Sequence, residues 1–381
     1  MTELVEILQS PLDQSHVALG ATMIKRDGWR VPATYGNDEA EYAAVRDGGA
    51  GLIDLSPRGR ILVGGSEAVQ FLNGLITNDM KTLAEGSWMP AAFPNVQGRL
   101  IASVRVVRLK DEGEGKNVSP TYLLDTEATT HQSVLKTIER FTLAGDFRVT
   151  DITNETAELS LQGSNAANLL RSVMGEVAEL APNGAMVTLW HESGVTVVRA
   201  SHTTEDGFDL ILDSKHAVSL WRAFQEAGAR PVGHNALEIL RIEAGLPRFG
   251  IDMDESNIVT ESNLDDAVSF TKGCYVGQEI IARIKYRGHV AKKLVGLTTD
   301  EAVKLQAGSS IKSIDEKDIG RITSAIYSPR LDRTIALAYV KYDYLTPGTA
   351  VKVVGSDVEV AAQVTELPFV RGSWFEQEQK D

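Results

Sequence analysis

The chain has 381 residues, a formal net charge of −14 and a single cysteine, with hydrophobic residues at 43%. This length predicts about two or three domains, and one cysteine excludes an intramolecular disulfide and favours a reducing compartment. The acidic balance argues against a surface that coats nucleic acid, because phosphate would be repelled over most of the molecule.

The N-terminal region shows no basic segment followed by an apolar run, and no arginine precedes Arg26. Neither a secretory signal nor a transit peptide is therefore indicated. No apolar stretch approaches the roughly 18 residues that a membrane span needs. We expect a cytoplasmic protein that does not interact with membranes.

Two segments further along the chain resemble each other. They are 61–72, which begins ILVGGSEA, and 159–170, which begins LSLQGSNA. Each pattern is typical of a strand, a glycine turn, a serine that caps a helix, and a helix with apolar residues at helical spacing. We interpret them as a duplicated α+β module, although such units are common enough for chance agreement.

Strands and helices continue to alternate through the next part of the chain. A strand is expected at 100–109, and a hairpin is expected from 195–200 and 208–212, which flank an Asp-Gly turn. Helices are expected at about 214–227 and 235–244, each followed by a glycine.

After residue 293 the pattern changes to short β-rich runs separated by glycine and proline, which predicts a small antiparallel barrel or sandwich. The fold class is therefore α+β. The predicted organisation is an N-terminal segment, an α+β region of two related subdomains, a C-terminal barrel and a tail, at 1–34, 35–288, 289–372 and 373–381.

The boundary before the barrel lies in a basic run. No acidic residue occurs between 280 and 299, whereas five cations do, namely Arg283, Lys285, Arg287, Lys292 and Lys293. Two interpretations remain open, a solvated interdomain linker and a local anion site in an acidic protein.

Motifs for metals and nucleotides are missing. The sequence has no CxxC pair, no HExxH and no cluster of histidines, so we expect no structural metal site. It also has neither a complete dinucleotide fingerprint nor a Walker loop, so nucleotide hydrolysis is not supported.

The only cysteine, Cys274, lies in the most informative stretch of the sequence. The stretch comprises Lys272, Gly273, Cys274, Tyr275, Gly277, Gln278 and Glu279, with Arg283 four residues further on. A nearby lysine and a helix start both favour thiolate over thiol, which makes a cysteine reactive. The alternative is a small hydrophobic residue buried in a tight turn.

This stretch resembles the hallmark of the YgfZ branch of the glycine-cleavage T-protein (aminomethyltransferase) superfamily. Further blocks that resemble the superfamily occur at 42–56, 71–79, 241–255 and 320–340. Together they extend from about Tyr35 to Val370, and the first 34 residues lie outside them. The resemblance implies a three-lobed fold, with a C-terminal β-barrel, around a central channel that binds tetrahydrofolate.

The resemblance also implies two folate-binding residues. Glu205 falls in the stretch that matches the superfamily's pterin-binding motif, and a carboxylate there could accept two hydrogen bonds from the pterin. Arg241 matches an arginine near the carboxylate end of the folate. From the residues alone, Glu205 would be an exposed hairpin residue and Arg241 a surface residue of a helix.

One departure from the superfamily concerns the chemistry. Where aminomethyltransferases have two aspartates after an Asn-x-x-Gly-Gly segment, this chain has Ala102 and Ser103. Neither residue is a base near neutral pH, and the loss of such a group commonly costs ~10²–10⁴ in rate. This departure predicts negligible aminomethyl transfer.

These observations lead to the hypothesis of a folate-binding accessory protein for iron–sulfur cluster maturation or repair, and indirectly for tRNA modification. Its expected partners are folate and iron–sulfur proteins or their assembly factors, with Cys274 as the functional thiol. One cysteine cannot hold a cluster, so a transient ligand, a redox thiol and a docking surface remain open. The alternatives are a folate-dependent aminomethyltransferase or other one-carbon transferase, and a nucleic-acid-binding module that uses the basic run.

Overall fold

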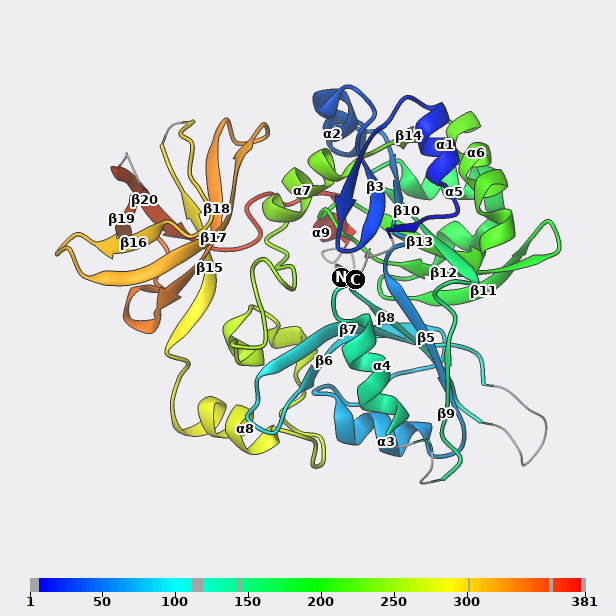
Figure 1. The fold of residues 1–381 in the computed structure, drawn as a ribbon, viewed down its shortest axis with the longest axis horizontal. Helices are drawn as coiled ribbons and strands as arrows, with labels where there is room; N and C mark the ends of the chain where they lie inside the picture. The colour runs from blue at the N-terminus through cyan, green and yellow to red at the C-terminus, as the bar shows by residue number, and fades with distance from the viewer. Residues whose placement is uncertain are drawn as a thin grey trace, which may run out of the picture.

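The computed structural model describes residues 7–111, 119–140, 142, 145–300, 302–355 and 359–377. Figure 1 shows three lobes, with the barrel at the left, one α+β module at the bottom and the other, with the N-terminal segment, at the upper right. The first six residues of the predicted N-terminal segment and the last four of the predicted tail lie outside the described part.

The first α+β module is a five-stranded antiparallel sheet in the order β6-β7-β8-β5-β9. Its strands are β5 (Gly59–Gly64), β6 (Ser87–Pro94), β7 (Leu100–Arg108), β8 (Thr121–Thr126) and β9 (Arg148–Asp151). Two helices, α3 (Ala68–Leu75) and α4 (His131–Glu139), pack on one face through Leu72, Val134 and Ile138. The helical spacing of these buried residues is what the apolar pattern of the sequence predicts.

The second module is a six-stranded sheet in the order β11-β12-β13-β10-β4-β14. Its strands are β4 (Gly51–Asp54), β10 (Thr156–Gln162), β11 (Ala185–Trp190), β12 (Ser193–Arg199), β13 (Gly207–Asp213) and β14 (Arg230–Pro231). It is covered by α5 (Ala166–Met174), η1 (Glu176–Glu179), η2 (Ser214–His216) and α6 (Ala217–Glu226). The core between them is built around the fully buried Trp221, Phe224 and Phe208.

The two modules repeat one unit, as expected, in β5–α3 and β10–α5. Gly65 and Gly163 occupy the turns with φ of 115° and 139°, which favours glycine. A Cβ at either position would also lie within 2.4 Å of a backbone oxygen. The expected serine caps are wrong, because the helices begin at Ala68 and Ala166 without a side-chain cap.

The N-terminal segment packs on the second module and on a helix that is distant in the sequence. Its elements are β1 (Leu8–Gln9), α1 (Asp13–Ala18), β2 (Thr22–Arg26) and β3 (Trp29–Thr34), and α2 (Asp38–Arg46) follows it. Its three strands form a small sheet, and α2 packs against α7 (His234–Glu243) through Tyr42, Val45 and Leu240. The turn of the β2–β3 hairpin therefore lies near the junction of the two modules.

A connecting segment leads from α7 to the barrel. It contains η3 (Val259–Glu261), η4 (Asp265–Ala267) and α8 (Gln278–Arg287), and it packs through its own cluster against Ala92 and Leu100 of the first module. No helix in the described part of the chain is long and apolar enough to cross a membrane.

The C-terminal lobe is a closed antiparallel barrel in the order β15-β18-β17-β16-β19-β20. Its elements are β15 (Lys292–Thr298), β16 (Ser310–Ser313), β17 (Asp318–Ser328), β18 (Arg333–Lys341), η5 (Tyr342–Tyr344), β19 (Ala350–Val354) and β20 (Glu359–Thr365), followed by α9 (Ser373–Gln377). The predicted α+β fold, with a duplicated module and a C-terminal antiparallel barrel, is confirmed.

Candidate active site

A cavity of about 350 Å³ lies at the junction of the two modules. Its wall is formed by residues of β4, β6, β7 and β8, by α7 and by the turn of the β2–β3 hairpin. The lining combines apolar side chains, such as Trp88 and Leu237, with several arginines and carboxylates. Such a mixture is typical of a small-molecule site, in which a few polar groups set orientation.

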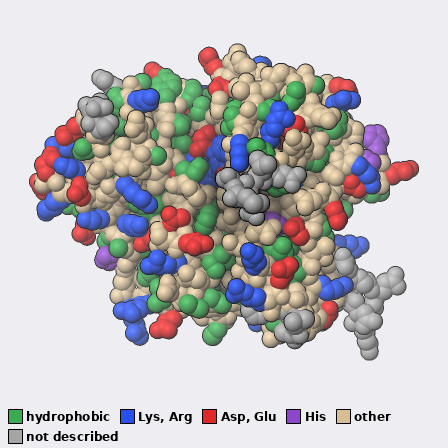
Figure 2. Space-filling view, in the orientation of Figure 1, with side chains coloured by type: hydrophobic (Ala, Val, Ile, Leu, Met, Phe, Trp, Pro, Cys, Tyr) green, Lys and Arg blue, Asp and Glu red, His purple; other side chains and the backbone are tan. Residues whose placement is uncertain are grey.

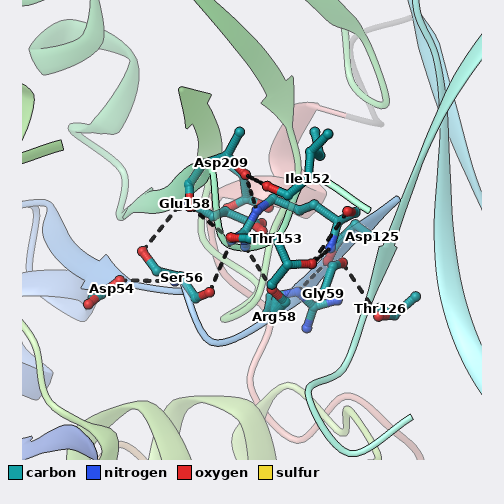
Figure 3. Close-up of polar contacts among 12 residues, drawn as sticks. Asp54, Ser56, Arg58, Gly59, Asp125, Thr126, Ile152, Thr153, Glu158 and Asp209 are labelled. Atoms are coloured by element: carbon teal, nitrogen blue, oxygen red, sulfur yellow. Dashed lines mark hydrogen bonds and ion pairs between the residues drawn. The ribbon is translucent and has the colours of Figure 1, made fainter. Parts of the chain in front are cut away.

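A buried arginine, Arg105 on β7, connects the cavity to a cluster of three carboxylates. Its guanidinium nitrogens lie 2.6 Å from Asp209, 2.7 Å from Asp125 and 3.3 Å from Glu158. Figure 3 shows these carboxylates and Arg58 in one network of contacts. They come from β8, β10 and β13, so both modules contribute to it.

Two further arginines balance this cluster. The Nε of Arg58 lies 2.6 Å from Asp125, and Nη1 of the fully buried Arg60 lies 3.5 Å from Glu158. Arg60 also donates to the carbonyls of Ser56 and Thr153. Buried charges of this kind are tolerated because each has an opposite charge or a hydrogen-bond partner.

The carboxylates of the cluster differ in protonation. Burial, with Asp125 close by, raises the pKa of Glu158 to about 8. Burial also acts to raise the pKa of Asp209, but His202 at 2.9 Å and Arg105 outweigh it and lower that pKa. The environment thus favours the ionised form of Asp209 and the protonated form of Glu158.

Glu127 follows β8 directly and lines the cavity, and it has no ionic partner among the residues that the structure describes. Both of its carboxylate oxygens lie 3.3 Å from the backbone nitrogen of Phe249. Burial raises the pKa of Glu127 to about 7, while Arg58, the Phe249 N–H and Arg241 act to lower it and Asp27 to raise it. A carboxyl group with this pKa can both accept and donate a proton near neutral pH.

Ion pairs surround one side of the cavity. Arg26 binds Glu238 at 3.0 Å, and Arg248 binds Asp27 at the hairpin turn. Burial, together with Arg26, lowers the pKa of the neighbouring His234 to about 4, so this imidazole is neutral at pH 7. These contacts join the N-terminal hairpin to α7 and to the segment that follows it.

Arg241, expected to contact folate, does lie on the cavity wall. Its two terminal nitrogens are engaged by Asp252 at 2.7 Å, by the carbonyl of Leu246, by Glu238 and by Ser324. Its Nε is buried without a hydrogen-bond partner among the described residues. The geometry thus brings Arg241 to the cavity with one donor unused.

Glu205, the other expected folate contact, does not line the cavity. It is buried, and its carboxylate lies 3.0 Å from Arg46 and accepts hydrogen bonds from the backbone and hydroxyl of Ser373. The alternative of an exposed hairpin residue is wrong, because Glu205 is buried in a longer loop between β12 and β13 that the C-terminal segment covers. A role of Glu205 in folate binding stays a prediction.

Cys274 is exposed and does not line the cavity. Its neighbour Lys272 is buried, and its ammonium donates to the carbonyls of Asn73, Ile76 and Asn78 at 2.6–2.9 Å. These carbonyls lie at the end of α3 and just beyond it, where a cation is favourable. Lys272 therefore joins the connecting segment to the first module.

The rest of the Cys274 stretch also packs against this module. Gly277 has a φ of 77°, and a Cβ there would lie 2.4 Å from the carbonyl oxygen of Asn95. Tyr275 is buried, whereas Gly273, Glu279 and Arg283 are exposed and Gln278 is half-buried at the start of α8. No ion pair joins Glu279 to Arg283 in the part of the chain that the structure describes.

Sequence reasoning did not identify Arg105, Asp125 or Glu127 as site residues. A usable signal was present, because Asp125 interrupts an otherwise apolar strand and Glu127 follows it at the strand end. A charge within a buried strand needs a partner, which would have directed attention to this end of the first module.

The fold and the cavity between its two modules define a member of the glycine-cleavage T-protein family, and comparison with known proteins agrees. Residues 12–272 match the GCVT N-terminal domain, and residues 292–371 match the glycine cleavage T-protein C-terminal barrel domain. The chain belongs to this family.

Relatives extend over nearly the whole chain. A Rubrobacter xylanophilus protein named aminomethyltransferase is 34% identical over 95% of this chain and 94% of its own length. One from Thermotoga neapolitana, with the same name, is 31% identical over 96% and 98%. The crystal structure of the glycine cleavage system aminomethyltransferase T from Bartonella henselae superimposes with a TM-score of 0.88 at 25% identity, covering 96% of this chain and 98% of that one.

These comparisons correct the expected function. The hypothesis of an accessory protein for iron–sulfur proteins, without aminomethyl transfer, is contradicted by full-length relatives that are named as enzymes. The structure supplies a physical reason for the error. The absence of acids at Ala102 and Ser103 was taken as the absence of any acid at the site, yet the cavity is lined by other carboxylates.

Proposed function

We propose that this protein is a folate-dependent aminomethyltransferase, which is one of the alternative hypotheses that the sequence supports. The observation that carries the proposal is the full-length similarity to aminomethyltransferases together with a cavity, lined by carboxylates and arginines, at the junction of the two modules. In this proposal the cavity binds tetrahydrofolate and an aminomethyl donor reaches it from solvent.

The lining suits a reduced folate in size and in chemistry. A cavity of about 350 Å³ falls within the range of roughly 300–1,000 Å³ found for ligand pockets. Arg105 and Arg241 each have a buried Nε without a partner among the described residues, and such donors favour a ligand with carbonyl or carboxylate oxygens. Trp88 and Leu237 supply apolar surface for a flat ring.

The residues of the chain would hold and orient the folate, which supplies the nitrogen that receives the aminomethyl carbon. Arg105, positioned by three carboxylates, presents a fixed cationic group on the wall. Arg241 is held by Asp252 and Glu238 and places its charge on the same wall. Because both guanidiniums are already oriented, little conformational freedom is lost on binding.

The test is turnover of tetrahydrofolate by the purified full-length protein with an aminomethyl donor, combined with calorimetry for folate binding. We expect saturable binding and formation of a one-carbon folate. The matched variant is Arg241→Met, which should weaken binding by roughly 10-fold or more because it removes a charged donor from the wall. The absence of both binding and turnover in the wild-type protein would reject the proposal.

We also infer that the chain belongs to the YgfZ-type branch of the family, on the stretch from Lys272 to Glu279. The close packing of Gly277 on Asn95 gives this stretch a structural reason for its composition. If the exposed thiol of Cys274 has a role specific to the branch, alkylating it with iodoacetamide should alter folate binding or turnover. Unchanged values would reduce the stretch to a packing element.

A further inference from the structure

The positions of the missing aspartates differ in their surroundings. Ala102 is fully buried in the core of the first module, whereas Ser103 lines the cavity. A carboxylate at Ser103 would thus face the cavity. Serine cannot replace it as a base near neutral pH.

The register of the sheet sets a carboxylate beside Ser103. Strands β7 and β8 are antiparallel, and their last pair at this end is Val104 with Thr126. One step further in the same register brings Ser103 alongside Glu127, and both residues line the cavity. The acid lost from one strand therefore has a counterpart at the end of its neighbour.

Glu127 differs from the other carboxylates on the cavity wall in the described part of the chain. Each of the others has an ionic partner on a basic side chain: Asp27 with Arg248, Asp54 with His16, Asp125 with Arg58, and Glu238 with Arg26. Glu127 has only the backbone N–H of Phe249, at 3.3 Å from each oxygen. It is the one carboxylate of this set that can exchange a proton without breaking an ion pair.

The charges around Glu127 come from three other elements. Arg58 lies in the loop after β4, Arg241 on α7 and Asp27 at the hairpin turn. The two arginines favour the ionised form, and burial and Asp27 favour the protonated form. The balance leaves both forms populated near neutral pH, which is the condition for a general acid–base group.

We propose that Glu127 is the acid–base group of aminomethyl transfer in this protein, in place of the aspartate that the family has at the Ser103 position. This inference rests on the proposed function. As the bond between the folate nitrogen and the aminomethyl carbon forms, the Glu127 carboxylate accepts the proton of that nitrogen. It then returns the proton to the donor atom whose bond to the same carbon breaks, so atoms and electrons balance without a redox partner.

Proton exchange on binding tests the inference apart from turnover. Calorimetry of tetrahydrofolate binding near pH 7 in buffers of different ionisation enthalpy measures the protons exchanged. We expect a fraction of one proton for the wild type and close to none for Glu127→Gln, because the ligand covers a half-protonated carboxyl group. The control is Glu139→Gln, an exposed glutamate at the end of α4, which should match the wild type. Equal exchange by wild type and Glu127→Gln would overturn the inference.

Turnover then separates this inference from the proposed function. Glu127→Gln should lower kcat by ~10²–10⁴ with folate affinity within about threefold. The wild-type kcat should rise with pH through about 7, and the residual rate of the variant should lack this step. The double variant Ser103→Asp, Glu127→Gln should have a kcat at least ~10-fold higher than that of Glu127→Gln alone. If Glu127→Gln turns over folate as fast as the wild type, only the role of Glu127 is refuted. If the wild type neither binds nor turns over folate, both the role of Glu127 and the proposed function are refuted.

Discussion

The cavity wall and the Cys274 stretch use charged residues in different ways. Arg105 on the wall and the three carboxylates around it come from strands of both modules and hold one another in place. In the Cys274 stretch, Lys272 is used to satisfy carbonyls of the first module, and the cysteine beside it is exposed. In the stretch that is most distinctive in sequence, Lys272 thus forms a structural joint, meaning a contact that holds the connecting segment on the first module. The residues on the cavity wall that are suited to chemistry are dispersed along the chain.

Charges of both signs are also spread over the exterior. Figure 2 shows acidic and basic side chains interspersed on one face of the molecule, so the net charge of −14 is not concentrated there. The contrast that matters for function lies inside, between charges that are paired and buried and Glu127, the one cavity carboxylate without an ionic partner in the described part of the chain.

The largest effect is expected from Arg105→Met. Removing this guanidinium takes away the counter-charge that the buried carboxylates of Asp125 and Asp209 share, which should lower the free energy of unfolding by about 3–5 kcal/mol. Urea unfolding measures it. The control Arg148→Met breaks an exposed pair with Asp146 and should cost less than about 1 kcal/mol. Equal effects of the two substitutions would remove the distinction between buried and exposed charges.

Glu205→Ala should come next. The substitution removes one of the acceptors of Arg46 and leaves the backbone and hydroxyl of Ser373 without theirs, at a cost of about 2–3 kcal/mol in the free energy of unfolding. Folate affinity, measured below the unfolding transition, then decides the role predicted from the resemblance. Affinity lost in a variant that is still folded would favour a direct contact, and affinity kept would favour a purely structural residue.

Lys272→Met tests the structural joint directly. Three carbonyls lose a charged donor, and we expect the free energy of unfolding to fall by about 1–3 kcal/mol. Methionine keeps much of the aliphatic stem, so packing is largely retained. Hydrogen exchange at the end of α3 should accelerate in the same variant. If exchange there stays unchanged, the ammonium does not hold this helix end.

Glu127 should also affect the pH dependence of stability. Its pKa is raised from 4.5 to about 7, so the folded protein retains a proton that the unfolded chain has released in this range. Its contribution to stability is therefore fully present below pH 4.5 and is lost as the pH rises through about 7. Urea unfolding at several pH values in this range should show that the free energy of unfolding falls more steeply with rising pH in the wild type than in Glu127→Gln. Parallel curves would contradict it.

The smallest effect is expected from Cys274→Ala. The side chain is exposed, so the free energy of unfolding should change by less than about 0.5 kcal/mol. Urea unfolding of Cys274→Ala and of Lys272→Met compares the contributions of two positions in one stretch to stability. A loss of turnover in the stable Cys274→Ala protein would show that the thiol takes part in the chemistry.

Local sequence patterns determined much of the fold. Strand β5 with α3, and β10 with α5, were recognisable because helical and strand periodicity and the glycines at their turns act within a few residues. The β-rich barrel followed from spacing in the same way. The family followed from several ordered blocks along the chain.

The site depended on tertiary structure. Arg105, Asp209 and Glu158 are far apart in sequence and meet only because the two sheets pack against each other at one junction. The pairing of Val104 with Thr126, which brings Ser103 alongside Glu127, is a property of strand register. No local pattern encodes which strand ends share a cavity, because that depends on how whole modules pack. This is why the missing aspartate could be seen in the sequence, whereas the carboxylate proposed to replace it could be identified only from the fold.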